Sequence, residues 1–188
     1  MSRVAAIVLA GGRSTRFGSD KLAVALNGTP LVSHAIEAAR AFGAEVVVVG
    51  PDGPGLPVDV TVVREDPPYS GPYAAVAAGL GAVDPEASIV LVLAGDLVDP
   101  GALLPRLVAA VERHGAEAAV ALDSSGLRQP LLAAYRLVPL LGGIVGVDPV
   151  NRAASELLDG LHVVEVPDDD RRHTRDIDTV EDLAAEIP

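Results

Sequence analysis

The sequence predicts an α/β fold: a three-layer sandwich in which helices cover both faces of a mainly parallel sheet. Short apolar runs rich in β-branched residues are typical of strands buried on both faces. Four such runs stand out: Val4–Leu9, Val46–Val49, Val60–Val63 and Ile89–Leu93. Helical stretches separate most of them, and this alternation indicates a Rossmann-like sheet in a single domain over residues 1–188.

Capping signals mark the helices between these strands. Thr29 and Pro30 form a favourable N-cap and N1 pair for a helix that runs to Phe42 and stops at Gly43. Asn27-Gly28 indicates a tight turn just before it. The other expected helices are Pro72–Val83, Asp99-Pro100 to His114 with Gly115 as the stop, and Thr179–Glu186, and the other expected strands are Ala116–Leu122, Leu131–Arg136 and Leu161–Val166.

Composition excludes several classes of function. The net charge of −12 argues against binding a nucleic-acid backbone, which needs a basic face. The chain has no cysteine, so disulfides and thiolate metal sites are excluded. No apolar run approaches the length of a membrane helix, and a first strand explains the apolar start better than a signal peptide does. We expect a cytoplasmic protein, a monomer or a small homo-oligomer.

A glycine-rich loop with three cations follows the first strand. It reads Leu9-Ala-Gly-Gly-Arg-Ser-Thr-Arg-Phe-Gly-Ser-Asp-Lys21. Glycines let backbone N–H groups approach phosphates, and Arg13, Arg16 and Lys21 could offset the charge of a triphosphate. An ordinary turn with solvated charges is the alternative. Lys21, however, is the only lysine beside thirteen arginines, and a compact ammonium differs from a guanidinium in bridging phosphate oxygens.

Three carboxylates are candidates for ligand or metal binding. Asp96 follows the strand Ile89–Leu93 and is placed to hold Mg²⁺ beside phosphates. Helix capping is the alternative, but Asp99 before Pro100 is expected to fill that role. Asp66 follows Val60–Val63 and is either a ligand contact or a turn-forming residue before proline. Asp178 is either a second metal ligand or the N-cap of the last helix.

Other polar segments are expected to be structural. Asp168–Asp170 with Arg171-Arg172 is interpreted as a solvated loop, and Ser124-Ser125-Gly126 as a turn. The four histidines show no metal-ligand spacing. The glycine-rich loop, Asp66 and Asp96, in contrast, all follow strands. The carboxyl ends of parallel strands share one edge of the sheet, so these groups should meet around one crevice.

The loop from Leu9 to Lys21 resembles the signature of nucleotidyltransferases with the nucleotide-diphospho-sugar transferase type of fold. The branch it is most similar to is molybdenum cofactor guanylyltransferase. The segments that support this branch are Gly71-Pro-Tyr-Ala-Ala-Val-Ala-Ala-Gly-Leu80, Gln129-Pro130-Leu131 on the acceptor side, and Asp176-Ile-Asp-Thr-Val-Glu-Asp-Leu183. The resemblance spans nearly the whole chain.

The resemblance implies transfer of GMP from GTP to molybdopterin with Mg²⁺ and release of pyrophosphate. The residues it implies as nucleotide contacts are Leu9, Ala10, Gly11, Gly12, Arg13, Lys21, Asp66 and Gly71. Lys21 and Arg16 would stabilise the phosphates, and Asp96, with Asp178, would bind the metal. No side-chain nucleophile is required, because positioning and charge neutralisation can carry this transfer.

The chain departs from the family pattern at several places. Gly50 stands where the family often has asparagine near the base, and Asp176-x-Asp178 replaces Asn-x-Asn, as in related cytidylyltransferases. The alternatives are therefore transfer of CMP to molybdopterin, or another small nucleotidyltransferase such as a sugar-phosphate enzyme. A nucleotide-binding adaptor without catalysis is the alternative from another class.

Overall fold

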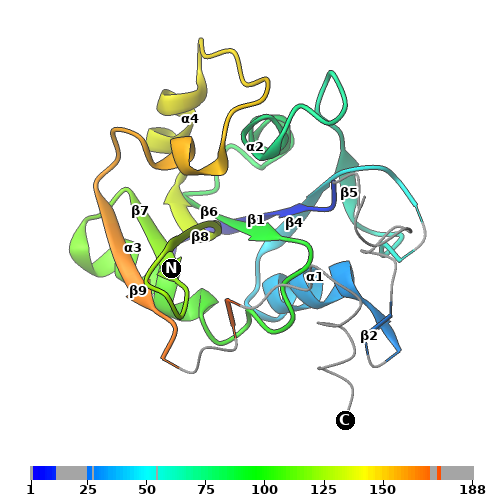
Figure 1. Ribbon diagram of the computed structural model, residues 1–188, viewed down its shortest axis with the longest axis horizontal. Coiled ribbons are helices and arrows are strands. Elements are labelled where there is room, and N and C mark those ends of the chain that lie inside the picture. Colours follow the sequence, from blue (N-terminus) through cyan, green and yellow to red (C-terminus); the bar gives the residue numbers. More distant parts are fainter. Residues whose placement is uncertain (1, 12–24, 27, 54, 170–172, 175–188) are drawn as a thin grey trace.

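The computed structural model describes residues 2–11, 25–26, 28–53, 55–169 and 173–174, and its main feature is one large sheet between two helical layers (Figure 1). The strands are β1 (Val4–Leu9), β2 (Ala25–Leu26), β3 (Thr29–Pro30), β4 (Glu45–Val49), β5 (Thr61–Val63), β6 (Ile89–Ala94), β7 (Ala118–Leu122), β8 (Arg128–Arg136) and β9 (Val163–Pro167). The helices are α1 (Leu31–Ala41), α2 (Pro72–Leu80), α3 (Leu104–His114), α4 (Leu137–Ile144) and the 3-10 helix η2 (Ala154–Leu158).

The main sheet has seven strands in the order β5-β4-β1-β6-β8-β7-β9. Its strands are parallel except β8, which runs antiparallel to both of its neighbours. The predicted α/β sandwich with a mainly parallel sheet is therefore confirmed. Because β8 alone is reversed, its amino end lies at the same edge as the carboxyl ends of the other six strands. Within the described residues, no helix is long and apolar enough to cross a membrane.

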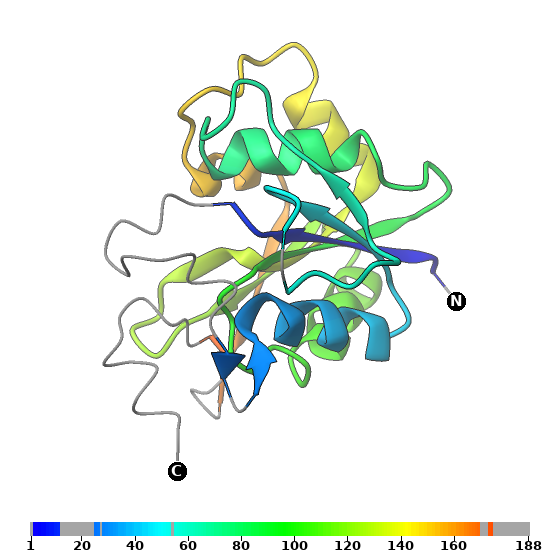
Figure 2. The ribbon, with the colours of Figure 1, turned by 90° about the vertical axis from the view of Figure 1, so that its right-hand side faces the viewer.

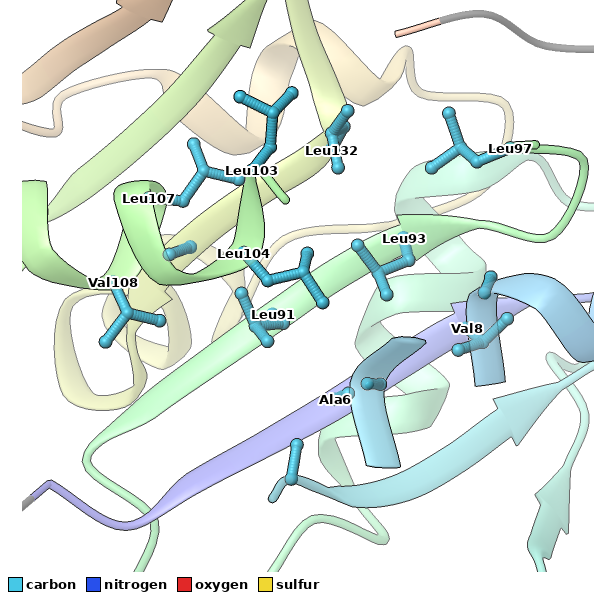
Figure 3. Packing of buried hydrophobic residues seen from close by; sticks show 14 of the residues in the cluster. Ala6, Val8, Leu91, Leu93, Leu97, Leu103, Leu104, Leu107, Val108 and Leu132 are labelled. Carbon is cyan, nitrogen blue, oxygen red and sulfur yellow. The ribbon is translucent and has the colours of Figure 1, made fainter. Parts of the chain in front are cut away.

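Helices cover both faces of this sheet (Figure 2), as the continuous apolar strands predict. Side chains of β1, β4 and β6 alternate between two cores, one under α1 and α3 and the other under α2, α4 and η2. Figure 3 shows the first core, in which Leu104 of α3 lies close to Leu91 of β6. Both cores are almost wholly aliphatic, and they hold the parallel strand ends in place.

Two predicted helix starts are wrong. Thr29 and Pro30 form β3, which pairs with Ala25 and Leu26 of β2, so α1 begins at Leu31. Strand pairing here overrides a local capping signal. Helix α3 begins at Leu104 rather than after Asp99, because a turn closed by the Leu103 N–H to Pro100 O hydrogen bond precedes it.

The predicted helix ends agree better with the structure. Gly43 and Gly115 follow α1 and α3 in the left-handed conformation, with φ of 91° and 60°. Helix α2 ends at Leu80, three residues before the expected Val83, because i to i+3 hydrogen bonds from Gly81 and Ala82 close its last turn. Asn27 and the expected helix Thr179–Glu186 lie outside the described residues.

Candidate functional site at the carboxyl edge of the sheet

The end of β1 lies at the carboxyl edge, between the ends of β4 and β6. Backbone hydrogen bonds continue past the strands there: the Ala10 N–H donates to Val49 O (2.8 Å) and the Gly95 N–H donates to Leu9 O (3.0 Å). Leu9 and Ala10 are buried, whereas Gly11 is exposed. Of these three residues, Gly11 is therefore the most accessible to a ligand.

Glycines flank the end of β1 on both sides for a steric reason. A Cβ at Gly50 would lie 2.6 Å from Ala10 O, and a Cβ at Gly95 would lie 2.6 Å from Leu9 O. Neither residue was singled out as a site residue from the sequence, although each ends an apolar run. At position 50, where the related family often has asparagine, this backbone accepts no side chain without shifting. The strand ends can approach one another only because both positions lack a Cβ.

Several predicted site residues lie outside the described residues. They are Gly12, Arg13, Arg16, Lys21 and Asp178. Their proposed roles with phosphates and metal therefore stay predictions.

Asp96 lies where the sequence predicts, directly after β6 and next to Gly95, and its side chain is half-buried. Asp99 does not cap α3, which begins five residues after it, so the predicted capping role of Asp99 is wrong and no longer favours metal binding by Asp96. Among the described residues there is no group of three or more His, Asp or Glu side chains that could hold a metal ion. A magnesium site here would therefore rely on few carboxylates, as is usual when phosphates and waters complete the shell.

The turn after β5 brings a carboxylate that was not predicted close to Gly11. Glu65 is 8% exposed, and its Oε1 accepts the Tyr69 N–H at 2.9 Å. A Cβ at Gly11 would lie 4.0 Å from the same oxygen. Glu65 Oε2 is buried and has no hydrogen-bond partner among the described residues. Asp66, the predicted contact, is exposed in the turn before Pro67, which agrees with both of its interpretations.

Gly71 is the N-cap of α2, with φ of 95°, and the helix begins at Pro72 as the sequence predicts. Some of the residues around Gly71 have a structural role. The Asn151 N–H donates to Ser70 O (2.7 Å), and a Cβ at Gly71 would lie 3.4 Å from Arg152 O. The loop before η2 thus packs against this helix start. The predicted nucleotide contact of Gly71 is not tested by this packing.

The interpretation of this stretch as a solvated loop is wrong for Asp168, whereas Asp169 is exposed and residues 170–172 lie outside the described residues. Asp168 is 6% exposed, and its Oδ2 accepts hydrogen bonds from the His173 N–H (2.9 Å), the Thr174 N–H (3.0 Å) and the Thr174 hydroxyl (3.0 Å). Burial raises the pKa of Asp168, but these hydrogen bonds outweigh burial and hold the pKa below its ordinary value. His173 Nδ1 lies 2.7 Å from Asp99 O, which ties this turn to the loop after β6.

A second polar pair lies at the amino end of β8. The turn predicted at Ser124–Gly126 is confirmed: the Gly126 N–H donates to Asp123 O (3.0 Å), and Gly126 has φ of 82°. Asp123 Oδ2 accepts a hydrogen bond from Gln129 Nε2 at 2.8 Å. The motif Gln129-Pro130-Leu131 points to Gln129 in the sequence, whereas the pairing of Gln129 with Asp123 depends on the reversed direction of β8.

The comparisons with known proteins agree with this arrangement. The model of the MobA-like NTP transferase domain matches residues 6–170. The chain belongs to the MobA-like NTP transferase family. The chain is thus a nucleotidyltransferase.

Three proteins illustrate the likeness of this MobA-like chain. A probable molybdenum cofactor guanylyltransferase from Mycobacterium bovis is 32% identical over 189 residues, covering 97% of this chain and 92% of the relative. Another from Chloroflexus aggregans is 34% identical over 145 residues, covering 71% and 67%. The crystal structure of molybdopterin-guanine dinucleotide biosynthesis protein A from Archaeoglobus fulgidus superposes with a TM-score of 0.71 at 22% identity, covering 97% and 96%.

Proposed function

We propose that this nucleotidyltransferase transfers GMP from GTP to molybdopterin in the presence of Mg²⁺. The observation that carries the proposal is that Gly11, Glu65 and Asp96 all follow strand ends at one edge of the sheet, around the glycine-flanked end of β1. The names of the relatives, at about a third identity, support guanylyl transfer to this cofactor.

In this proposal the nucleotide lies over the end of β1. Gly11 offers backbone to the phosphates, and Arg13, Arg16 and Lys21 offset their negative charge. The terminal phosphate oxygen of molybdopterin attacks the α-phosphorus of GTP. The bond from the α-phosphorus to the bridging oxygen of the β-phosphate breaks, and pyrophosphate leaves with both electrons of that bond. Orientation and charge neutralisation by the chain's own groups lower the barrier.

The residues present fit a magnesium ion. Carboxylate oxygen is the ligand that Mg²⁺ prefers, and protein sites usually give it one or two carboxylates beside substrate phosphates. Asp96, half-buried after β6, would supply the first carboxylate and Asp178 the second. When bound, the ion would withdraw charge from the α-phosphate and from the leaving pyrophosphate.

Transfer of CMP is the second candidate, because Asp176-x-Asp178 resembles the cytidylyltransferase pattern. Equilibrium binding of GTP, CTP, ATP and UTP, each with and without Mg²⁺, separates the candidates. Magnesium-dependent GTP binding at least tenfold tighter than CTP binding, about 1.4 kcal/mol, is expected. A preference for CTP by the same factor would move the chain to cytidylyl transfer. Failure to bind any triphosphate would contradict the proposal. Tight nucleotide binding without turnover of any acceptor would indicate an adaptor.

A further inference from the structure

The strand β8 carries a polar side chain to the same edge as Asp96. The ladder between β6 and β8 runs from Ile89 opposite Arg136 to Leu93 opposite Leu132. Asp96 lies three residues beyond Leu93, and Gln129 lies three residues before Leu132 on the antiparallel neighbour. Both residues therefore extend past the last pair of the ladder in the same direction. Gln129 flanks the site on the side of β6 that faces away from β1.

The pairing of β8 with β7 is irregular next to Gln129. The ladder between β7 and β8 shifts register between Val120 and Ala121, which opposes Gln129. Tyr135, fully buried, donates its hydroxyl hydrogen bond to Pro130 O (2.9 Å), inside the shifted stretch. Burial raises the pKa of Tyr135, so its hydroxyl stays protonated as a donor. Bulges beside active sites typically re-aim a side chain, and here the irregular stretch directly follows Gln129.

Asp123 fixes which way the Gln129 amide faces. Its Oδ1 accepts the Ser125 N–H (2.8 Å), the Ser125 hydroxyl (2.7 Å) and the Leu127 N–H (3.0 Å), and its Oδ2 receives Gln129 Nε2 (2.8 Å). Hydrogen bonds from Ser125 and Leu127 lower the pKa of Asp123, so it is a carboxylate at neutral pH. A carboxylate only accepts hydrogen bonds, so the amide nitrogen must face Asp123 and Oε1 must face away.

We propose that Asp123 is a positioning residue that turns the Gln129 carbonyl toward the acceptor, where Oε1 accepts an N–H from the acceptor's heterocycle. This inference rests on the proposed transfer to molybdopterin, whose pterin ring carries an amino group and ring N–H donors. Gln129 is then a specificity residue for the acceptor and not for the nucleotide. The neighbouring Arg128 donates a hydrogen bond to Glu165 (2.8 Å). The Gln129 amide, rather than the Arg128 guanidinium, is therefore the group that contacts the acceptor.

The substitution Asp123→Asn reverses the polarity of the pair. The oxygen of the asparagine stays with its three donors, because turning it away would oppose three N–H or O–H groups. Its nitrogen then faces Gln129, whose amide must flip and present N–H groups to the acceptor. Asp123→Asn combined with Gln129→Glu restores an acceptor atom, because the glutamate accepts the asparagine N–H and offers its other oxygen. Net charge in this double variant equals that of the wild type.

Steady-state transfer to molybdopterin, with KM measured separately for acceptor and nucleotide, tests the inference. Asp123→Asn is expected to raise the acceptor KM at least tenfold, to leave nucleotide KM within about twofold, and to be rescued to within about threefold by Gln129→Glu. These limits correspond to free-energy differences of about 1.4, 0.4 and 0.7 kcal/mol. Asp148→Asn is the matched control, since its carboxylate also accepts a local N–H, from Val150 at 3.1 Å, and it should change neither KM.

Three results would overturn the inference: an unchanged acceptor KM in Asp123→Asn, a raised KM without rescue, or a change in the nucleotide KM instead. Gln129→Met guards against misfolding, because it leaves the three hydrogen bonds to Asp123 Oδ1 in place and should also raise the acceptor KM. If the wild type itself transfers nothing to molybdopterin, the proposed function fails, and this inference fails with it. Wild-type turnover with a normal Asp123→Asn variant overturns this inference alone.

Discussion

The carbonyl oxygen of Ala10 occupies the space where a side chain at position 50 would begin. A Cβ at Gly50 would lie 2.6 Å from that oxygen, closer than such atoms approach in folded proteins. The same relationship recurs on the other flank of β1, between Gly95 and Leu9 O. Two glycines make this tight packing of three strand ends possible, and the exposed Gly11 follows directly after it.

Adding a single methyl group at either flank should therefore damage both stability and binding. Gly50→Ala and Gly95→Ala are each expected to lower the free energy of unfolding by about 1–3 kcal/mol, because the backbone of β1 must shift. Nucleotide affinity should fall at least tenfold. Chemical denaturation and titration with GTP measure the two effects.

The control for these variants is Gly142→Ala on α4, where a Cβ meets nothing within 4 Å. It should leave nucleotide binding unchanged and stabilise the helix by up to about 1 kcal/mol. Wild-type stability and affinity in Gly50→Ala would show that the strand ends are not packed as described.

The buried carboxylate of Glu65 should stabilise the turn that lies against Gly11. Glu65→Ala removes the acceptor of the Tyr69 N–H, and Tyr69 has an unfavourable φ of 66°. We expect a loss of about 1–3 kcal/mol in stability and at least tenfold weaker binding of nucleotide, because the turn lies against Gly11. Thermal unfolding and nucleotide titration check both. Glu86→Ala, whose side chain is 80% exposed in an ion pair with Arg3, should change neither, and equal effects in the two variants would refute a special role for Glu65.

Asp96 should be needed for the magnesium dependence of the reaction. In Asp96→Asn the affinity for GTP with Mg²⁺ is expected to fall to its value without the ion, and turnover should drop at least a hundredfold, about 2.7 kcal/mol. Asp99→Asn is the matched control, because this carboxylate lies in the same loop and its side chain is 65% exposed. Unchanged turnover in Asp96→Asn would remove this residue from the metal site.

Acid should weaken the fold through Asp168. Its pKa is lowered in the folded state, so the folded chain holds this proton more weakly than the unfolded chain does. Its contribution is present above the unfolded pKa, about 3.9, and is lost as pH falls through the lower folded pKa. Asp168→Asn should cost about 2–4 kcal/mol at pH 7, and its difference from the wild type should shrink below about pH 4.

Urea unfolding at several pH values measures this difference. Asp169→Asn is a suitable control, because Asp169 is exposed and makes a surface ion pair with Arg106. It should stay within about 0.5 kcal/mol of the wild type at each pH. A gap between Asp168→Asn and the wild type that widens in acid would contradict the assignment.

The fold was predictable because strands buried on both faces of a sheet have continuous apolar sequences. Runs such as Val4–Leu9 and Ile89–Leu93 are wholly apolar, and the structure gives strands at the same places. Helix α4 was missed because Pro139 and the pair Gly142-Gly143 contradict helix propensity. Burial of Leu137 and Leu140 against β8 and its surroundings outweighs that propensity.

The site was predictable only in part. Asp96 could be placed because it follows an obvious strand, as could Gly11. Glu65 was overlooked beside the more conspicuous Asp66, and Asp168 was hidden in a charged stretch whose burial depends on the distant turn at His173 and Thr174. Such residues acquire their partners only when distant segments meet, which local patterns do not reveal.

The most direct test of guanylyl transfer uses GTP labelled on its α-phosphate and measures where the label goes. The purified chain is expected to move this label to molybdopterin, to release one pyrophosphate for each transfer and to require Mg²⁺. It should use GTP at least tenfold better than CTP in kcat/KM, about 1.4 kcal/mol. Absence of label transfer from GTP, while active acceptor and ion are present, would contradict the proposed function.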